Sequence, residues 1–232
     1  MERVGHSRLP AYAAHVFVDD LESPALAADD LHHLARVLRL RAGEAITAGD
    51  GAGRWRTCVM GDGRDLAPTS NIEAVPQPAP TITVGFALTK GDKPEFTVQK
   101  LTELGVDRIV PIAAARTVVQ WDDAKAARNV ERWRAVARAA AMQSRRVWLP
   151  VVDEVRPLGA LAPVPALAHP DGEPLTLRTP SVAVGPEGGW TDEELASAAA
   201  LVDLGSTTLR AETAALAAAV LLTAQREQRF SV

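Results

Sequence analysis

The sequence predicts two domains, a small β-rich domain followed by an α/β domain with a mainly parallel sheet. A proline-rich segment at 73–81 contains almost no side chains suited to a hydrophobic core. Short β-type segments separated by turn residues precede it, and strand-like and helix-like segments alternate over about 150 residues after it. We therefore expect a first domain over residues 1–75, a linker over 76–80 and a second domain over 81–232.

The first domain is predicted to contain three strands and one helix. Strand-like runs are bounded by turn residues, such as those of the glycine-rich segment 49–53. Leucine and valine recur at helical spacing over 29–40 and Gly43 follows them, a pattern that predicts a helix and its end. The strands are expected at 14–18, 45–48 and 54–60.

The second domain is predicted to begin with a strand at 82–88 and a helix that ends at Leu104. Pro94 suits the first turn of that helix, and Gly105 suits the position after its end. The next helix, rich in alanine and arginine, is expected at 123–144. The remaining strands are expected at 109–113, 148–152, 165–168 and 181–184, with a further short strand inside 204–209.

Two more helices complete the prediction for the second domain. Thr191 and Glu194 have the spacing of a capping box, in which each side chain accepts a hydrogen bond from the other residue's backbone N–H. A helix is therefore expected to start at that point. The final helix is expected at 212–228.

The composition indicates a folded protein of a reducing compartment. The 232 residues are 47% hydrophobic and 23% charged, which excludes intrinsic disorder and fibrous repeats. Cys58 is the only cysteine, so an internal disulfide and a cysteine-rich zinc site are excluded and the cytosol is the expected location. The longest apolar stretch, 214–222, is much shorter than the roughly 20 residues that cross a bilayer. Residues 1–18 lack the pattern of a secretory signal.

The charge distribution indicates a nucleic acid partner although the net charge is −4. The segment 128–146 holds six arginines and one acid, Glu131. Like charges spaced i,i+4 on a helix, such as Arg128 and Arg132, repel each other unless an anion meets them, and RNA phosphates would do so. The alternative interpretation is a charged helix face in contact with solvent.

Other residues are interpreted with the same partner in mind. A smaller basic cluster follows His32 and His33 and consists of Arg36, Arg39 and Arg41. Because the histidines lack the spacing of metal ligands, we interpret this pair as packing or RNA-contact residues and expect no metal site. Trp55 is a candidate for stacking on a base, and the other tryptophans are expected in the core. The residues expected to contact RNA are Arg36, Arg39, Lys90, Lys93, Arg132, Arg138 and Arg146.

The strongest local sign of a ligand site is the sequence GPEGG at 185–189. It directly follows the apolar strand 181–184 and directly precedes the capped helix. Ligands of parallel α/β sheets bind beyond the carboxyl ends of strands, and glycines let the backbone approach a ligand closely. The alternative is a tight turn without a ligand. No G-x-G-x-x-G follows a strand and 89–93 lacks the spacing of a Walker loop, so ordinary dinucleotide and nucleoside triphosphate sites are not indicated.

A second strand-to-helix junction, 204–214, carries an arginine in an unfavourable place. Arg210 lies beside the amino end of the final helix, which already has a partial positive charge. This position predicts an anion, or a negative charge that develops during a reaction, close to Arg210. The alternative is an ion pair of Arg210 with Glu212 or Glu187. Glu212 and Thr213 are also candidates for a helix cap.

Several motifs together resemble one known family. The match spans nearly the whole chain in the expected order, and it is to the bacterial 16S rRNA uridine-N3 methyltransferases of the SPOUT superfamily. The segment 32–44 is similar to the PUA-like domain that these enzymes carry. The motifs of the second domain are GPEGGWTxxE at 185–194, LGxxxLRAETA at 204–214, TKGDKxExxxQKxxELGV at 89–106 and QSRR at 143–146.

The resemblance implies a SPOUT-type parallel-sheet methyltransferase domain tied into a trefoil knot and preceded by a small β-rich PUA-like domain. It also implies a homodimer, S-adenosylmethionine as the methyl donor and 16S rRNA of the small ribosomal subunit as the partner. One departure is Ala139, where the family commonly has glutamate, so any contact of that glutamate is missing here. The implied donor-binding residues are Gly185, Pro186, Glu187, Gly188, Gly189, Leu204, Gly205, Leu209 and Thr213.

The implied chemistry agrees with the position of Arg210. Methylation of N3 of uracil requires loss of the N3 proton, so negative charge spreads over the ring carbonyls, and Arg210 is the candidate catalytic residue that would stabilise it. Glu187 and Glu212 are the nearest candidates for a base, although both are expected to organise the loops while water or hydroxide takes the proton. The alternatives are a ribose 2′-O-methyltransferase of the same superfamily and a non-catalytic RNA-binding module.

Overall fold

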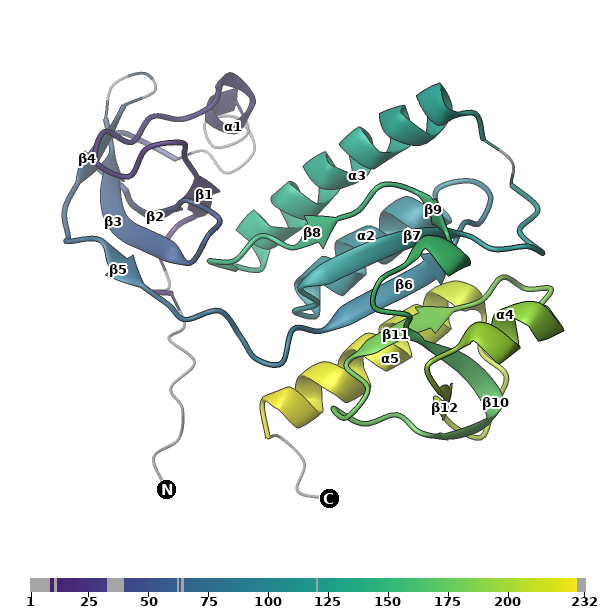
Figure 1. The fold of residues 1–232 in the computed structure, drawn as a ribbon. Coiled ribbons are helices and arrows are strands. Elements are labelled where there is room, and N and C mark those ends of the chain that lie inside the picture. The colour runs from purple at the N-terminus through teal and green to yellow at the C-terminus, as the bar shows by residue number, and fades with distance from the viewer. Residues whose placement is uncertain are drawn as a thin grey trace. The chain divides into compact units, whose positions relative to one another are not determined.

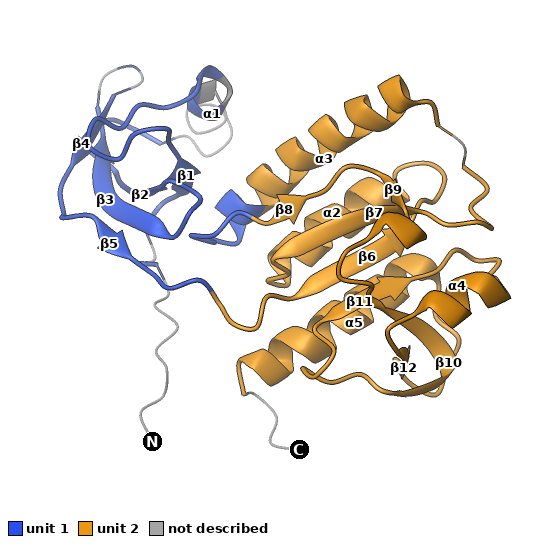
Figure 2. Ribbon diagram, viewed as in Figure 1, with its two compact units in different colours: residues 1–77, 141–149 blue, residues 78–140, 150–232 orange. Residues whose placement is uncertain are grey.

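The protein is represented by a computed structural model, which divides the chain into two compact units (Figure 2). The first unit comprises residues 1–77 and 141–149, and the second comprises 78–140 and 150–232. Each unit is considered separately below. The structure describes residues 9–10, 12–32, 40–61, 63, 65–119 and 121–228.

The first unit is built on a mostly antiparallel sheet of five described strands. Their order is β1-β2-β3-β4, with β5 pairing β3, and only β1 and β2 run parallel. The three predicted strands are confirmed within a residue of their bounds, whereas β4 and β5 were not predicted. The strands are β1 His15–Phe17, β2 Ala45–Gly49, β3 Arg54–Met60, β4 Leu66–Pro68 and β5 Glu73–Ala74.

Two predictions for the first unit need correction. Strand β5 lies inside the proline-rich segment, because backbone pairing with Arg54 and Trp55 does not require core-type side chains. Helix α1 spans Ala28–His32, so its predicted start is confirmed, and Leu40 lies outside any helix. Residues 33–39 of the predicted helix lie outside the described residues.

The turn between β2 and β3 is fixed by Asp50. Its Oδ1 accepts hydrogen bonds from the backbone N–H groups of Ala52 at 2.8 Å and Arg54 at 3.0 Å, which is the geometry of an Asx-type turn. The strands it joins supply buried side chains to one core. The members of this core include Val16, Val18, Ile46, Ala48, Cys58, Met60 and Leu66.

The segment 141–149 is an integral part of the first unit. Trp148 forms an isolated β-bridge with Ala52, and its Nε1 donates to the carbonyl of Val75 at 3.0 Å. The N–H of Leu149 donates to the Gly51 carbonyl at 2.9 Å. The strand predicted at 148–152 therefore begins only at Val151, because the backbone of Trp148 and Leu149 pairs within the first unit instead.

His15 and Arg145 strengthen the attachment of this segment. The Nε2–H of His15 donates to the carbonyl of Arg146 at 3.1 Å, so its Nδ1 accepts from the Thr47 hydroxyl at 2.9 Å. Arg145 has φ of 58° and donates to the carbonyls of Pro10, at 2.9 Å, and Tyr12. Side chains and carbonyls from distant parts of the sequence thus hold 141–149 in place.

The second unit is built on a parallel sheet of seven described strands (Figure 1). The order β12-β10-β11-β6-β7-β8, with β9 also pairing β7, places β6 and β11 in its centre. All of these pairs are parallel, as the alternation of strands and helices predicts. The strands are β6 Thr83–Ala87, β7 Arg108–Ala113, β8 Val151–Val152, β9 Arg156–Pro157, β10 Ala166–Pro174, β11 Ser181–Val184 and β12 Leu201–Asp203.

The helices of this unit also follow the sequence closely. Pro94 occupies the first turn of α2, Gly105 follows it with φ of +90°, and Thr191 and Glu194 form the predicted capping box of α4. The strand expected inside 204–209 is wrong. The strand β12 precedes it, because the apolar Leu201 and Val202 pair with β10 while 204–209 forms a polar loop. The helices are α2 Lys93–Glu103, α3 Asp123–Gln143, η2 Leu158–Ala160, α4 Asp192–Ser197 and α5 Ala211–Arg226.

Alternate residues of the strands feed hydrophobic clusters on the two faces of this sheet. Val182 and Val184 of β11 pack in a cluster with the helices α2 and α5, whereas Ala183 packs with Leu158 and Trp190 in another. The trefoil knot implied by the family resemblance stays a prediction. No helix among the described residues is both long enough and apolar enough to span a bilayer.

The close packing at Gly53 generates a prediction for stability. Gly53 has φ of +92°, and a Cβ there would lie 2.4 Å from Trp148 Cζ2 and 2.7 Å from the Val75 carbonyl oxygen. We expect Gly53→Ala to lower the free energy of unfolding by about 2–4 kcal/mol in urea titrations. Gly43→Ala is the matched control, since Gly43 has φ of +87° but open space, and should cost about 1 kcal/mol. Equal losses for the two variants would contradict the packing argument.

The buried His15 generates a prediction for pH dependence. Desolvation lowers the pKa of His15 from 6.5 to about 4, outweighing its hydrogen bond to Arg146, and the charge of Arg145 lowers it further. The unfolded chain takes up this proton near pH 6.5, so the stabilisation is complete above that pH and is lost as the pH falls towards 4. Between pH 7 and 5, wild type should lose roughly 2 kcal/mol of unfolding free energy more than His15→Gln. Parallel pH profiles for the two proteins would refute the prediction.

Candidate functional site

A cavity of about 750 Å³ lies beyond the carboxyl ends of β11 and β12 in the second unit, beside residues 168–170 of β10. It is formed by the segments 168–170, 184–187, 189–190 and 203–211, joined by Arg116 and Ala214. Parallel strands end at the same edge of a sheet, so loops distant in sequence converge there. Seven predicted donor-binding residues line the cavity, namely Gly185, Pro186, Glu187, Gly189, Leu204, Gly205 and Leu209.

The loop 185–190 is shaped by glycine and by a buried tryptophan. The ring of Trp190 fills the space beside Gly185, where a Cβ would lie only 3.0 Å from Trp190 Cε2. Trp190 is 5% exposed, and its Nε1 donates to the carbonyl of Ala168 on β10 at 3.2 Å. The N–H of Gly189 closes a tight turn by donating to the Pro186 carbonyl at 2.9 Å, with φ of +70° at Gly189.

The loop 203–210 supplies the opposite part of the cavity wall. The N–H of Gly205 donates to Asp203 Oδ1 at 3.1 Å, and Gly205 has φ of +133°. Arg210 is the N-cap residue of α5, where its exposed side chain makes no capping hydrogen bond. It also has no ion pair within the described part of the chain. The predicted donor-binding residues Gly188 and Thr213 do not belong to the cavity lining.

The acids near this site pair with a lysine rather than with Arg210. Lys93 Nζ lies 3.6 Å from Glu187 Oε1 and 3.4 Å from Glu212 Oε1. The alternative that Arg210 pairs with these glutamates is therefore wrong, because Lys93 at the start of α2 supplies their positive charge. The other oxygen of Glu212, Oε2, is buried without a hydrogen-bond partner in the described structure.

Arg116 is a cavity residue that the sequence reasoning missed. It follows β7 in a turn closed by the hydrogen bond from Thr117 N–H to the Ala114 carbonyl at 3.0 Å. One terminal nitrogen of Arg116 donates to the carbonyls of Gly188 at 3.1 Å and Trp190 at 2.9 Å. A signal was present, since the polar residues after 109–113 come at the carboxyl end of a predicted parallel strand.

The basic residues predicted to contact RNA have different surroundings. Arg132 pairs with Glu95, and Arg134 contacts Glu131 at 2.5 Å and Glu154 at 2.7 Å. Carboxylates of the chain thus supply the negative charge that Arg132 and Arg134 require, so the repulsion between arginines does not by itself indicate RNA at these two residues. Lys90 is exposed, while Arg138 and Arg146 are half-buried and engaged in contacts.

Some of the predicted contact residues lie outside the described residues, and one is buried. The side chains of His32, His33, Arg36 and Arg39 are not among those described. Trp55 is only 4% exposed, so its candidacy for base stacking is wrong and it belongs to the interior of the first unit. The described residues contain no group of three or more histidine, cysteine, aspartate or glutamate side chains that could hold a metal.

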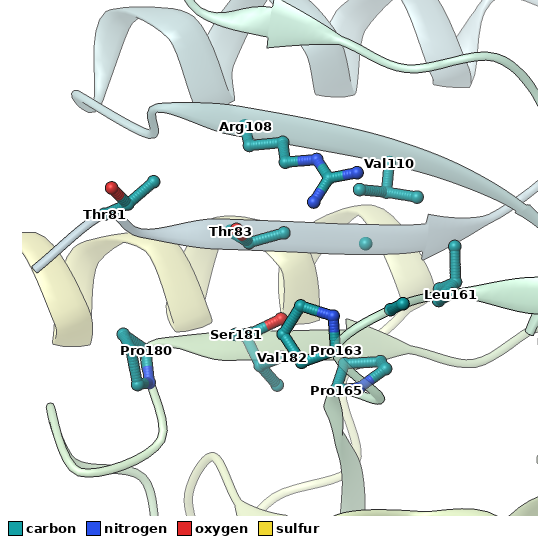
Figure 3. A pocket seen from close by; sticks show the side chains of 12 residues that line it. Thr81, Thr83, Arg108, Val110, Leu161, Pro163, Pro165, Pro180, Ser181 and Val182 are labelled. Carbon is teal, nitrogen blue, oxygen red and sulfur yellow. The ribbon is translucent and has the colours of Figure 1, made fainter.

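A second cavity of the same unit, of about 270 Å³, lies near the amino ends of β6, β7 and β11 (Figure 3). Its wall is largely apolar and includes Pro163 and Pro165. The guanidinium of Arg108 lines it and forms a paired contact with Asp153, at 2.6 Å from NH2 to Oδ2 and 3.0 Å from Nε. It lacks the glycine loops of the larger cavity, which is therefore the better candidate site.

The chain matches two descriptions of protein families. The RNA methyltransferase domain matches residues 76–223, and the RNA methyltransferase PUA domain matches residues 26–66. These matches cover both the strand-to-helix junctions at the larger cavity and part of the β-rich first unit. The two matched regions follow each other in the order that the sequence predicts.

Relatives and a solved structure extend over most of the chain. "Ribosomal RNA small subunit methyltransferase E" of Mycobacterium bovis is 37% identical over 217 residues, with 82% of each chain covered. The protein of the same name from Bacillus subtilis is 28% identical, covering 90% of this chain and 93% of its own. The crystal structure of the Neisseria gonorrhoeae protein of that name, bound to S-adenosyl methionine, is 32% identical with a TM-score of 0.75. It covers 89% of this chain and 95% of that chain.

Proposed function

The chain belongs to the ribosomal RNA small subunit methyltransferase E family, and on this premise we propose that it methylates N3 of a specific uridine in 16S rRNA with S-adenosylmethionine as donor. The observation that carries this proposal is the cavity of the second unit. Its two glycine-bearing loops coincide with the motifs GPEGG and LGxxxLR, and Arg210 lies at its edge without a partner among the described residues.

The cavity fits a ligand of the size and character of this donor. Its volume of about 750 Å³ falls in the usual range for small-molecule sites. Val184, Leu204 and Leu209 offer apolar contacts for a nucleoside, and the polar loop 205–208 offers backbone groups. When bound, S-adenosylmethionine supplies a methyl group on a positively charged sulfur, which becomes a neutral thioether as N3 takes the methyl group.

The chain's own contribution to the chemical step is proposed to come chiefly from Arg210. Loss of the N3 proton leaves negative charge on the neighbouring ring oxygens of uracil. A guanidinium at the amino end of α5, with no carboxylate to neutralise it, can donate two hydrogen bonds to one of these carbonyl oxygens and leave N3 free to take the methyl group. The helix end adds its own partial positive charge at the same place.

The two carboxylates nearest this site are proposed to organise it. Lys93 lies between Glu187 of the first loop and Glu212 of α5, so all three charges are engaged with one another. A carboxylate that is engaged with a cation is less free to reach the N3 proton of a bound uridine. We therefore assign the N3 proton to water or hydroxide, and we assign Glu187 and Glu212 to the positions of the loop and helix.

The RNA surface, the homodimer and the cytosolic location are parts of the same proposal. Exposed Lys90 follows β6 at the carboxyl edge of the sheet and is suited to a phosphate contact. Arg132, Arg138 and Arg146 are proposed to add to phosphate binding, with Arg132 exchanging Glu95 for the phosphate. An assembled small subunit or its 16S rRNA is the proposed partner of these residues.

The proposed function predicts one product of the reaction. Small-subunit rRNA from cells that lack this protein should carry unmodified uridine at the target, and purified protein with S-adenosylmethionine should convert it to 3-methyluridine. Mass spectrometry of nuclease digests measures this conversion. A methyl group on ribose would identify a 2′-O-methyltransferase instead, and binding of RNA without transfer would identify a non-catalytic module.

The role of Arg210 predicts a loss in turnover rather than in binding. Arg210→Ala should keep the donor affinity and reduce the rate at saturating donor by on the order of 10²–10³, as removal of one oxyanion-hole donor does. Arg210→Lys should recover little, because an ammonium cannot reproduce the planar two-pronged contact. Raising the pH should reduce the difference in rate between Arg210→Ala and wild type, since more uridine then loses its N3 proton unaided. Normal turnover, or loss of donor binding, would contradict the catalytic role.

A further inference from the structure

We propose that Arg116 is a positioning residue for the methyl donor, which it serves by holding the loop 185–190 in its binding conformation. This inference rests on the proposed function, because it takes the cavity beside that loop as the donor site. It assigns to Arg116 an effect on donor affinity that passes through the backbone of the loop. Arg116 is therefore not expected to touch the reacting atoms.

Two carbonyl groups of the loop converge on one nitrogen of Arg116. The carbonyls of Gly188 and Trp190 both accept from the same terminal nitrogen of Arg116, at 3.1 and 2.9 Å. These hydrogen bonds involve a charged donor and are stronger than those between neutral groups. They fix the peptide group that precedes Gly189, the residue with φ of +70°, and the peptide group that follows Trp190.

Ordering of the loop 185–190 costs backbone conformational entropy. Gly188 and Gly189 are adjacent glycines, which lose more backbone freedom on ordering than any other residue type. Within the loop, the described hydrogen bond from Gly189 N–H to the Pro186 carbonyl closes only one turn. Trp190 anchors the far end through its buried ring. Arg116 is the contact that restrains the glycine pair itself.

Arg116 and the adjacent Ala115 lie in a turn that hydrogen bonds hold in place. Arg116 belongs to the turn 114–117, which directly follows β7, a strand that pairs with β6, β8 and β9. The N–H of Ala115 donates to Glu194 Oε1 at 2.9 Å, and the other oxygen of Glu194 completes the capping box with Thr191. The end of β7 therefore binds both the loop and the start of α4. The turn 114–117, which is fixed at the end of β7, thus determines the conformation of the glycine-containing loop 185–190.

The test measures the affinity of the donor site for two nucleosides, one with the charged amino acid group and one without it. S-adenosylhomocysteine carries the amino acid carboxylate and 5′-methylthioadenosine lacks it. Isothermal titration of the full chain should show that Arg116→Ala weakens both by about tenfold, equivalent to about 1.4 kcal/mol. The rate of methylation at saturating donor should change by less than about threefold. A loss confined to the carboxylate-bearing nucleoside would mean that Arg116 contacts the ligand directly, and would overturn the proposal.

Amide hydrogen exchange supplies a measurement that needs no ligand. The N–H of Gly189 should exchange about tenfold faster in Arg116→Ala than in wild type, because opening of the loop becomes easier by the same factor. Arg116→Lys should restore most of the protection and affinity, since an ammonium can still donate to both carbonyls. Unchanged exchange and affinity in Arg116→Ala would overturn the inference.

Arg178→Ala is the matched control. Arg178 is an exposed arginine of the same unit, and its side chain has no ion pair or hydrogen bond within the described part of the chain. It should bind both nucleosides as wild type does, and an equal loss in this variant would overturn the specific role of Arg116. Should Arg116→Ala fail to fold, Arg116→Gln carries the test, with an intermediate affinity expected and wild-type affinity overturning the proposal.

The outcomes separate this inference from the proposed function. If wild type binds neither nucleoside, the donor assignment of the cavity fails and the inference fails with it. If wild type binds both and Arg116→Ala binds them equally well, the donor site stands and only the role of Arg116 is refuted. Circular dichroism in the near ultraviolet restricts each comparison to folded protein.

Discussion

The packing of Trp190 beneath Gly185 is the contact on which the candidate site depends. The indole occupies the space where a Cβ would lie, and its Nε1 donates to the Ala168 carbonyl, so one side chain joins the third residue of β10 to the residue that follows β11. A larger residue at 185 would displace the ring and break this connection. The loop that follows β11 can then turn tightly at Gly189, because its end is fixed in the core. The conformation of this loop therefore depends on the close packing of Trp190 in the core and not on the loop residues alone.

Electrostatic pairing divides the positive residues of the protein into two groups. Lys93, Arg132 and Arg134 lie beside carboxylates from the same chain. Such exposed pairs contribute little to stability, so they can exchange partners with an incoming phosphate at small cost. Arg210 differs, because the glutamates beside the cavity loops, Glu187 and Glu212, are engaged with Lys93. A basic sequence cluster is therefore not by itself a binding surface, and the unpaired guanidinium at the cavity is the more informative observation.

The first unit depends on a segment that is distant in sequence. Residues 141–149 begin with the last three residues of the long helix α3, yet Trp148 and Leu149 pair with the turn between β2 and β3. Gly51 and Gly53 have no side chain there because Leu149 and Trp148 occupy that space. The chain consequently passes from one unit to the other three times, after residues 77, 140 and 149. His15 remains neutral at ordinary pH because its ring is buried under this segment.

The sequence by itself determined the local structure and the position of the glycine junctions. Periodicity, the capping box at Thr191 and the stop at Gly105 are local signals, so α2 and β11 were predicted almost residue for residue and α4 was predicted at its start. The donor and its reaction came from the family resemblance of whole motifs. Only the tertiary structure decided that Lys93 pairs with Glu187 and Glu212 and that Arg116 donates to carbonyls of the loop 185–190. It alone also decided that residues 141–149 belong to the first unit. These contacts join residues tens of positions apart, and their partners are selected by the packing of the sheet, which no local pattern records.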